Sequence, residues 1–370
     1  MMKTLYLRLI ILFVAVLSLS FAIDTFIYKP SRKLPWSYVS DLIYLKSEFY
    51  TQNQDKFNAV FIGSSIVRRG FNCEVFDQNV DTTFTIKSFN FGINWLGFPE
   101  SLHFIDNIAL KNNGNLKYVF IELTKLKFVD AENMHTARSV YWYNLNYLKF
   151  TVEAALASPS SGWILRIALI ASHLLGYVEN SLNIDYFKNT TDFESRQLLI
   201  ADSLSVVGPD YRGFDCMDDD VKKVAAVNSE ENVQAAVSSF LKDTSGLEKR
   251  RIMSANGFSK FEKDVKFKDE VNTVYLDRLN SIVEAGKKQN IYVIYVLTPK
   301  TDKRQYDELI PLFYKLSPQH RINLADSRKY PDLYSFELAG DETHLNRKGA
   351  HLFSEILARE FNQIMRSQVK

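Results

Sequence analysis

The chain has 370 residues, 46% of them hydrophobic and 14% aromatic, which is enough for one large folded domain with an insertion. Its 45 basic and 43 acidic residues give a formal charge of +2, so no basic field supports binding to nucleic acid. The two cysteines form no CxxC motif and no Cys/His spacing of a metal site, and we expect neither a metal nor a cofactor.

The N-terminal residues have the composition of an export signal or a membrane segment. Lys3 and Arg8 precede an apolar run over residues 9–23. We expect residues 1–27 to form a single-pass membrane anchor, and the alternative is cleavage of a signal peptide after Ala22 followed by secretion. In both cases the rest of the chain would lie outside the cytoplasm, in the periplasm or the extracellular space.

The next segments predict an α/β domain with a parallel sheet. Residues 28–56 are expected to be a linker and then a helix over 37–50, because Pro30 and Pro35 interrupt any earlier helix. Apolar segments and amphipathic segments then alternate, which is typical of parallel strands joined by helices. The predicted strands are 57–62, 82–89, 116–123, 291–297 and 322–326, and the predicted helices are 98–112, 271–288, 306–316 and 346–365.

Residues from about 130 to 270 have little strand signal and predict a large helical insertion. The most apolar helix in it is predicted over 163–178. Because this helix contains Arg166 and His173, a second membrane span is not expected. We expect it to be a core helix of the insertion, and the alternative is a helix packed on the membrane or on a membrane partner.

The same insertion contains one cysteine beside several acidic residues. Asp215 and residues 218–220 are expected to form a solvated loop, as charge runs usually do. Cys216 and Cys73 could form a disulfide in an oxidising compartment or remain two buried thiols.

Two stretches contain residues suited to nucleophilic catalysis. Gly63, Ser64 and Ser65 follow the first predicted strand, where a tight turn can expose a serine hydroxyl. Asp341 lies three residues before His344, at the start of the last predicted helix. A histidine can accept a proton near neutral pH, and an aspartate can orient its ring. The stretches could form a Ser-His-Asp triad, or they could be an ordinary turn and a helix cap.

These stretches resemble sequence blocks of the SGNH (GDSL-like) hydrolase superfamily, over about residues 57–128 and 271–367. The resemblance implies a flavodoxin-like three-layer α/β/α sandwich for residues 57–370, interrupted by the helical insertion. It implies that Ser65 is the nucleophile, His344 its base and Asp341 the orienting acid. The backbone N–H groups of Ser65 and Gly92 match the donors of the family's oxyanion hole.

One block differs from the family pattern. The family has an asparagine after the third strand that also donates to the oxyanion, whereas this chain has Glu122 and Thr124 in that region and no asparagine. A carboxylate at Glu122 would oppose the developing negative charge. Thr124 or a backbone N–H could replace the asparagine, and without a replacement the enzyme would be slow or inactive.

The N-terminal segment and this divergent block look most like the membrane-anchored members of the superfamily, which include the alginate O-acetylation proteins and the D-alanylation protein of teichoic acid synthesis. This resemblance implies a serine O-acyltransferase or esterase acting on acyl groups, most simply acetyl, of a cell-surface polysaccharide. It also implies a membrane-bound O-acyltransferase as partner. The alternative is a catalytically degenerate domain that binds glycan or scaffolds the membrane complex.

Overall fold

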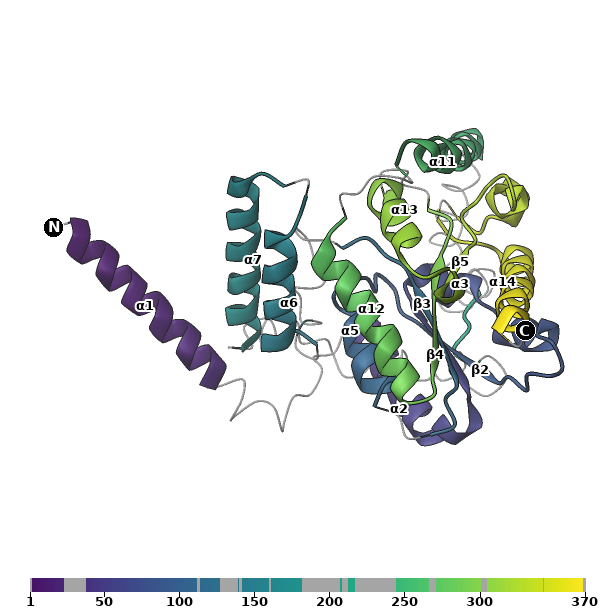
Figure 1. Ribbon diagram of the computed structural model, residues 1–370, viewed down its shortest axis with the longest axis horizontal. Coiled ribbons are helices and arrows are strands. Elements are labelled where there is room, and N and C mark those ends of the chain that lie inside the picture. The colour runs from purple at the N-terminus through teal and green to yellow at the C-terminus, as the bar shows by residue number, and fades with distance from the viewer. Residues whose placement is uncertain are drawn as a thin grey trace, which may run out of the picture.

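The fold is a five-stranded parallel sheet between two layers of helices (Figure 1). The computed structural model describes residues 2–22, 38–111, 114–126, 139, 142–159, 161–181, 207, 212–216, 244–265, 271–300, 305–341 and 343–368. The strands are β1 (Ala59–Gly63), β2 (Ser88–Gly92), β3 (Tyr118–Glu122), β4 (Tyr292–Leu297) and β5 (Arg321–Asn323). Their order is β2-β1-β3-β4-β5, which confirms the predicted flavodoxin-like α/β architecture.

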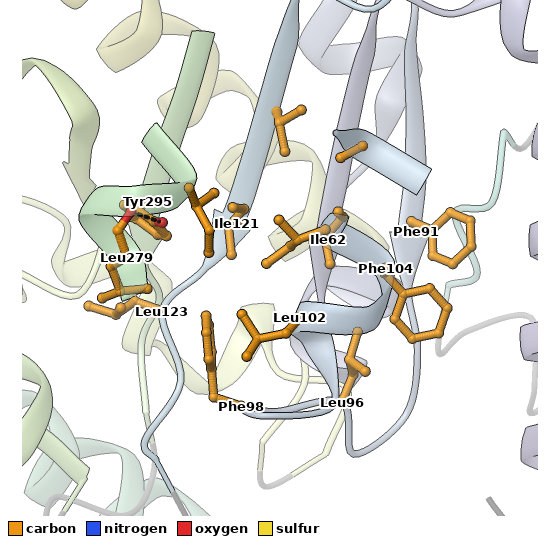
Figure 2. Close-up of a cluster of buried hydrophobic side chains, with 14 of the residues drawn as sticks. Ile62, Phe91, Leu96, Phe98, Leu102, Phe104, Ile121, Leu123, Leu279 and Tyr295 are labelled. Atoms are coloured by element: carbon orange, nitrogen blue, oxygen red, sulfur yellow. Dashed lines mark hydrogen bonds between the residues drawn. The ribbon is translucent and has the colours of Figure 1, made fainter. Parts of the chain in front are cut away.

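Alternating side chains of each strand enter two separate hydrophobic cores. Ile62 and Ile121 face one core, and Figure 2 shows them in one cluster with Leu102 and Phe104. Phe61 faces the other core. The first core is covered by α2 (Tyr38–Asn53), α5 (Ser101–Phe104), α12 (Thr273–Lys288) and α13 (Tyr306–Lys315), and the second by α3 (Ser65–Gly70), α4 (Cys73–Asn79) and α14 (Arg347–Gln368). Burial on both faces explains why β1 and β4 are almost entirely apolar.

Helix α2 belongs to the same core as the sheet, although its residues precede the first strand. Ile43 and Tyr50 pack in the first core. The fully buried Lys46 donates hydrogen bonds to the carbonyls of Asn90 (3.1 Å), Gly92 (2.7 Å) and Gly213 (2.8 Å). Burial lowers the pKa of Lys46 well below its usual value. These bonds attach α2 to the edge strand β2.

Several predicted elements have different bounds in the structure. The fifth strand, predicted over 322–326, ends already at Asn323. The strand predicted over 82–89 begins only at Ser88, where pairing with β1 starts. Before it, Asp81 accepts a hydrogen bond from the N–H of Thr83 (3.1 Å) and forms a turn. The helix predicted from Phe98 begins at Ser101, since a residue that precedes a proline disfavours helical backbone. It continues as a π-helical turn, Ile105–Ala109.

The insertion contains the predicted helices. Helices α6 (Leu145–Leu156) and α7 (Trp163–Ser181) pack together, and α11 (Thr244–Val265) packs on α13. In Figure 1, α6 and α7 lie beside the α/β body, and α1 (Met2–Ala22) lies beyond them. None of the described helices combines the length and the apolar character needed to cross a membrane. The predicted linker over 28–37 lies outside the described residues, and the N-terminal anchor stays a prediction.

The acidic residue beside Cys216 is not solvated, contrary to expectation. Asp215 is buried and forms ion pairs with Arg68 and Arg69 of α3. Its segment lies along β2, where Gly213 has a φ of 82° and approaches the backbone of Asn90 so closely that no Cβ would fit. Burial between these arginines removes Asp215 from water. Residues 218–220 lie outside the described residues.

Both cysteines are buried free thiols, so the disulfide alternative is wrong. Cys73 lies at the start of α4 in the second core, and Cys216 lies in a small separate cluster. Burial raises the pKa of the Cys73 thiol to about 12, which keeps it protonated at neutral pH.

Candidate active site

The first part of the candidate site is the turn between β1 and α3. Ser64 is the N-cap of α3, and its Oγ accepts a hydrogen bond from the N–H of Ile66 (3.2 Å). The next residue, Ser65, is the first of the helix, at the carboxyl edge of the parallel sheet. This edge is where ligands bind in open α/β folds. Both serines line the cavity, but the cap orients the Ser64 side chain toward its own helix, and it is Ser65 Oγ that meets a histidine.

The second part is the loop before α14, which brings Asp341 and His344 to Ser65. His344 Nε2 lies 2.8 Å from Ser65 Oγ. Its other ring nitrogen, Nδ1, lies 2.7 Å from Asp341 Oδ2. The structure therefore assembles the three residues selected from the sequence, 279 positions apart at the extremes, into one hydrogen-bonded chain.

Asp341 both orders its loop and holds the histidine. Its Oδ1 accepts hydrogen bonds from the backbone N–H groups of Thr343 and His344, each at 2.7 Å. Burial would raise the pKa of Asp341, but the hydrogen bonds and charge of His344 outweigh it and hold that pKa well below its usual value. The carboxylate is ionised at neutral pH, so Nδ1 of His344 donates to it. Nε2 is then free to accept the proton of Ser65.

An arginine from the insertion supports the acid loop. Arg251 of α11 is buried and donates to the carbonyls of Leu333 (3.1 Å) and Tyr334 (3.2 Å). Its third contact, at 3.4 Å, is the carbonyl of Asp341. Sequence patterns did not identify this residue, because it lies 90 positions from Asp341 in a helix without a distinctive motif.

The carboxylate of Glu122 does not face the cavity as an unpaired charge, because a buried lysine balances it beneath the turn that carries Ser65. Its fully buried side chain accepts hydrogen bonds from the N–H of Ser64 (2.7 Å) and the hydroxyl of Thr298 (3.0 Å). It also pairs with the ammonium of Lys300. Burial alone would raise the pKa of Glu122, but Lys300 and the Ser64 contact lower it. The charge that seemed to oppose an oxyanion is part of an ion pair that holds the turn.

Replacing Glu122 with Gln should destabilise the protein by about 3–5 kcal/mol, because it leaves the Lys300 ammonium buried without its counter-charge. The free energy of unfolding in urea would measure this loss. The double variant Glu122→Gln/Lys300→Met is the matched control, and it should recover much of the stability. Equal loss in the single and double variants would show that the ion pair is not responsible.

Gly92 does not fit its expected role as an oxyanion donor. Its N–H donates to Asn90 Oδ1 (2.8 Å). Its α-carbon packs so tightly against the backbone of Arg68 that a Cβ would lie 2.2 Å from the Arg68 nitrogen. The glycine allows close contact between β2 and α3. Gly97, which lines the cavity, is another candidate, because its backbone N–H has no acceptor in the described part of the chain.

Thr124 lines the same cavity as Ser65, as expected of a hydroxyl that donates to the oxyanion. Its Oγ1 accepts a hydrogen bond from the N–H of Phe98 (3.0 Å), which leaves the hydroxyl proton available to a ligand in the cavity. The same contact ties the turn of Gly97 to the end of β3. The N–H of Ser65, the N–H of Gly97 and the hydroxyl of Thr124 are therefore the candidate oxyanion donors.

Replacing Thr124 with Val should lower acyl turnover by about 10²-fold, the usual loss when one oxyanion donor is removed. The Thr124→Ser variant keeps the hydroxyl and should retain most of the rate. Steady-state kcat on a chromogenic acetyl ester distinguishes the two. Similar rates for Val and Ser variants would exclude Thr124 as a donor.

The cavity beside Ser65 is open and has an aromatic wall. Its volume of about 370 Å³ lies within the range of small-ligand sites. Trp95 lines it with a φ of 65°, a backbone conformation rare for a bulky residue, and is 62% exposed. The other lining residues include Trp142, Lys125 and Gln305. The site has room for an acyl group together with part of a larger polar molecule.

A buried carboxyl supports the segment that follows Thr124. Glu308 of α13 accepts a hydrogen bond from the N–H of Leu126 (2.7 Å), and burial raises the pKa of Glu308 to about 7. Between about pH 4.5 and pH 7 the folded state thus binds more protons than the unfolded state, so this group's contribution to stability falls as pH rises.

The Glu308→Gln variant should lack that decline, because its side chain stays neutral while its carbonyl still accepts from Leu126. Urea unfolding at several pH values from 4.5 to 8 would measure it, with the exposed Glu48→Gln as control. Parallel stability curves for wild type and Glu308→Gln would contradict the raised pKa.

No three His, Cys, Asp or Glu side chains cluster as a metal site within the described ranges. Comparisons with protein-family models, with curated proteins and with solved structures found no match to this chain. The functional interpretation therefore depends on the geometry of Ser65, His344 and Asp341 and on the cavity beside them.

Proposed function

We propose that the protein is a serine O-acyltransferase or esterase of the SGNH type. The observation that carries this proposal is the hydrogen-bonded chain from Ser65 Oγ through His344 to Asp341 at the carboxyl edge of the sheet. Nucleophile, base and orienting acid are all within hydrogen-bond distance, as nucleophilic catalysis requires. An ordinary turn and helix cap would not need the imidazole to bridge the two.

In the first half-reaction, Ser65 Oγ attacks the carbonyl carbon of an acyl ester. His344 Nε2 takes the serine proton, and the Asp341 carboxylate stabilises the imidazolium that forms. The candidate oxyanion donors hold the negative oxygen of the tetrahedral intermediate. When this intermediate collapses, the ester bond breaks, and His344 gives its proton to the departing alcohol. The acyl group remains bound to Ser65.

In the second half-reaction, an acceptor hydroxyl attacks the acyl-serine while His344 removes its proton. A sugar hydroxyl as acceptor gives a transferase, and water gives an esterase. The proton then returns from His344 to Ser65 Oγ, which regenerates the enzyme. Both outcomes use the same three residues.

As substrate we propose an acylated, most simply acetylated, cell-surface polysaccharide. The support is the open cavity with its exposed Trp95 and polar rim, together with the apolar N-terminal segment. That segment would hold the protein at the cell membrane by a single-pass anchor, with the catalytic domain outside the cytoplasm. A membrane-bound O-acyltransferase is the proposed partner that would supply acyl groups there.

The test is to incubate the full chain in detergent with a chromogenic acetyl ester, and separately with an acetylated polysaccharide and an unacetylated oligosaccharide acceptor. Acetate release and acetyl transfer are measured for wild type and for Ser65→Ala. Serine-dependent activity in either assay supports the proposal and identifies the preferred acceptor. Absence of both activities, in a protein that is folded, would favour the degenerate glycan-binding or scaffolding alternative.

A further inference from the structure

Helix α7 exposes an apolar side, unlike an ordinary surface helix. Its inward side mixes apolar Leu169 and Tyr177 with polar residues, namely His173, Asn180 and Ser181, all of which are buried. The opposite side exposes large apolar side chains along three turns. These are Trp163 (72% exposed), Ile164 (67%), Leu165 (46%), Ile167 (57%) and Leu175 (55%). A helix in water normally has the reverse arrangement.

The orientation of α7 is set by hydrogen bonds on its buried side. Tyr143 OH lies 3.1 Å from His173 Nδ1 and also donates to the His173 carbonyl (3.1 Å). Asn180 donates to the carbonyl of Tyr143 (2.6 Å). Rotating the helix to bury its apolar side would break these contacts and leave buried polar groups without partners. The apolar side is therefore held outward by the fold.

The outward side carries no charged group over its first three turns. Arg166, the nearest cation, folds back and donates to the carbonyls of Ser158 (2.6 Å) and Ser161 (2.8 Å). Ala168 and Ala171 occupy the exposed positions between the large side chains. The result is an aliphatic stripe with a tryptophan at its amino end, without the arginines, tyrosines and polar rim of a protein-binding surface.

Helix α1 is a second helix with exposed apolar side chains at this end of the molecule. It contacts α7, and it exposes Ile11, Leu12 and Val14. Figure 1 shows α1 and α7 as neighbours at one end of the molecule. We propose that the outer face of α7 lies in the interfacial layer of a lipid bilayer, parallel to its surface, together with the exposed apolar side of α1; the membrane anchor predicted for α1 is part of the proposed function on which this rests. The aliphatic stripe would enter the acyl chains, and Trp163 would lie at headgroup level.

Spin labels on the full chain in lipid nanodiscs test this proposal. Single cysteines are introduced as Ile164→Cys and Ile167→Cys on the stripe, and as Lys149→Cys on α6 and Glu284→Cys on α12 for controls. The control side chains are 74% and 63% exposed. The native Cys73 and Cys216 are buried, and the chain without added cysteines measures any background labelling. Collision rates of each label with oxygen and with a water-soluble nickel chelate are measured by electron paramagnetic resonance.

The ratio of the oxygen collision rate to the nickel collision rate should be severalfold higher for labels at 164 and 167 than for the two controls. The reason is that oxygen concentrates in lipid, whereas the nickel chelate stays in water. Ratios equal to the controls would place the stripe in water and overturn the proposal. Labels that are immobilised and shielded from both reagents would also overturn it, since they would show a protein partner or a second copy on the stripe. The measurement does not depend on acyl chemistry.

Discussion

Turnover of an acetyl ester is expected to fall by about 10⁶-fold when Ser65 is replaced with Ala, because the only atom able to form the acyl intermediate is removed. The fold should survive, since among the described residues the Ser65 side chain hydrogen-bonds to His344 Nε2 alone. The measurement is kcat with the chromogenic ester, together with the melting temperature. Turnover within tenfold of wild type would exclude Ser65 as the nucleophile.

Ser64→Ala is the matched control, since it removes the neighbouring hydroxyl. Ser64 Oγ caps α3 through Ile66, and losing such a cap costs about 1 kcal/mol of stability. We therefore expect a rate loss of at most about tenfold, corresponding to a small shift of the turn that carries Ser65. Comparing the two variants shows whether turnover falls because the nucleophile is missing or because the turn that carries it is disturbed.

Replacing Asp341 with Asn is expected to lower turnover by about 10⁴-fold, the loss seen when a triad keeps its shape without its charge. The amide oxygen can still accept hydrogen bonds from the N–H groups of Thr343 and His344. It cannot stabilise the imidazolium, and it no longer favours the tautomer with a proton on Nδ1. The variant should therefore stay folded, which circular dichroism and melting temperature would show.

The pH dependence gives a second check on Asp341. Because its pKa is held well below the usual value, the wild-type carboxylate should remain ionised throughout the neutral and mildly acidic range. Protonation of Asp341 should therefore not limit kcat in this pH range.

Near-normal turnover by Asp341→Asn would contradict the role proposed for Asp341. It would mean that this aspartate only orders its loop.

The elements with strong local patterns were predictable from sequence. The apolar runs of β1, β3 and β4 are buried on both faces, so each is recognisable without knowledge of its neighbours. The spacing of Asp341 and His344 is also local, because one short loop forms their contact. For these residues the sequence pattern and the structure agree.

The parts that could not be predicted depend on long-range contacts. The N–H of Gly92 donates to Asn90, whose side chain is held by the carbonyls of Val67 and Phe71, and no spacing rule shows this. The burial of Asp215 depends on Arg68, 147 positions away, and a charge run alone suggests a solvated loop. Arg251 and the Glu122–Lys300 pair are also tertiary features. They support the candidate site through contacts that only the folded chain creates.

The most direct test of the account is to find which atom becomes acylated. The full chain is treated with a fluorophosphonate probe, which reacts with activated serines, and the modified peptide is sequenced by mass spectrometry. We expect an adduct on Ser65 that persists in Ser64→Ala and is absent in Ser65→Ala. An adduct on Ser64, or a folded wild-type protein that is never modified, would contradict it.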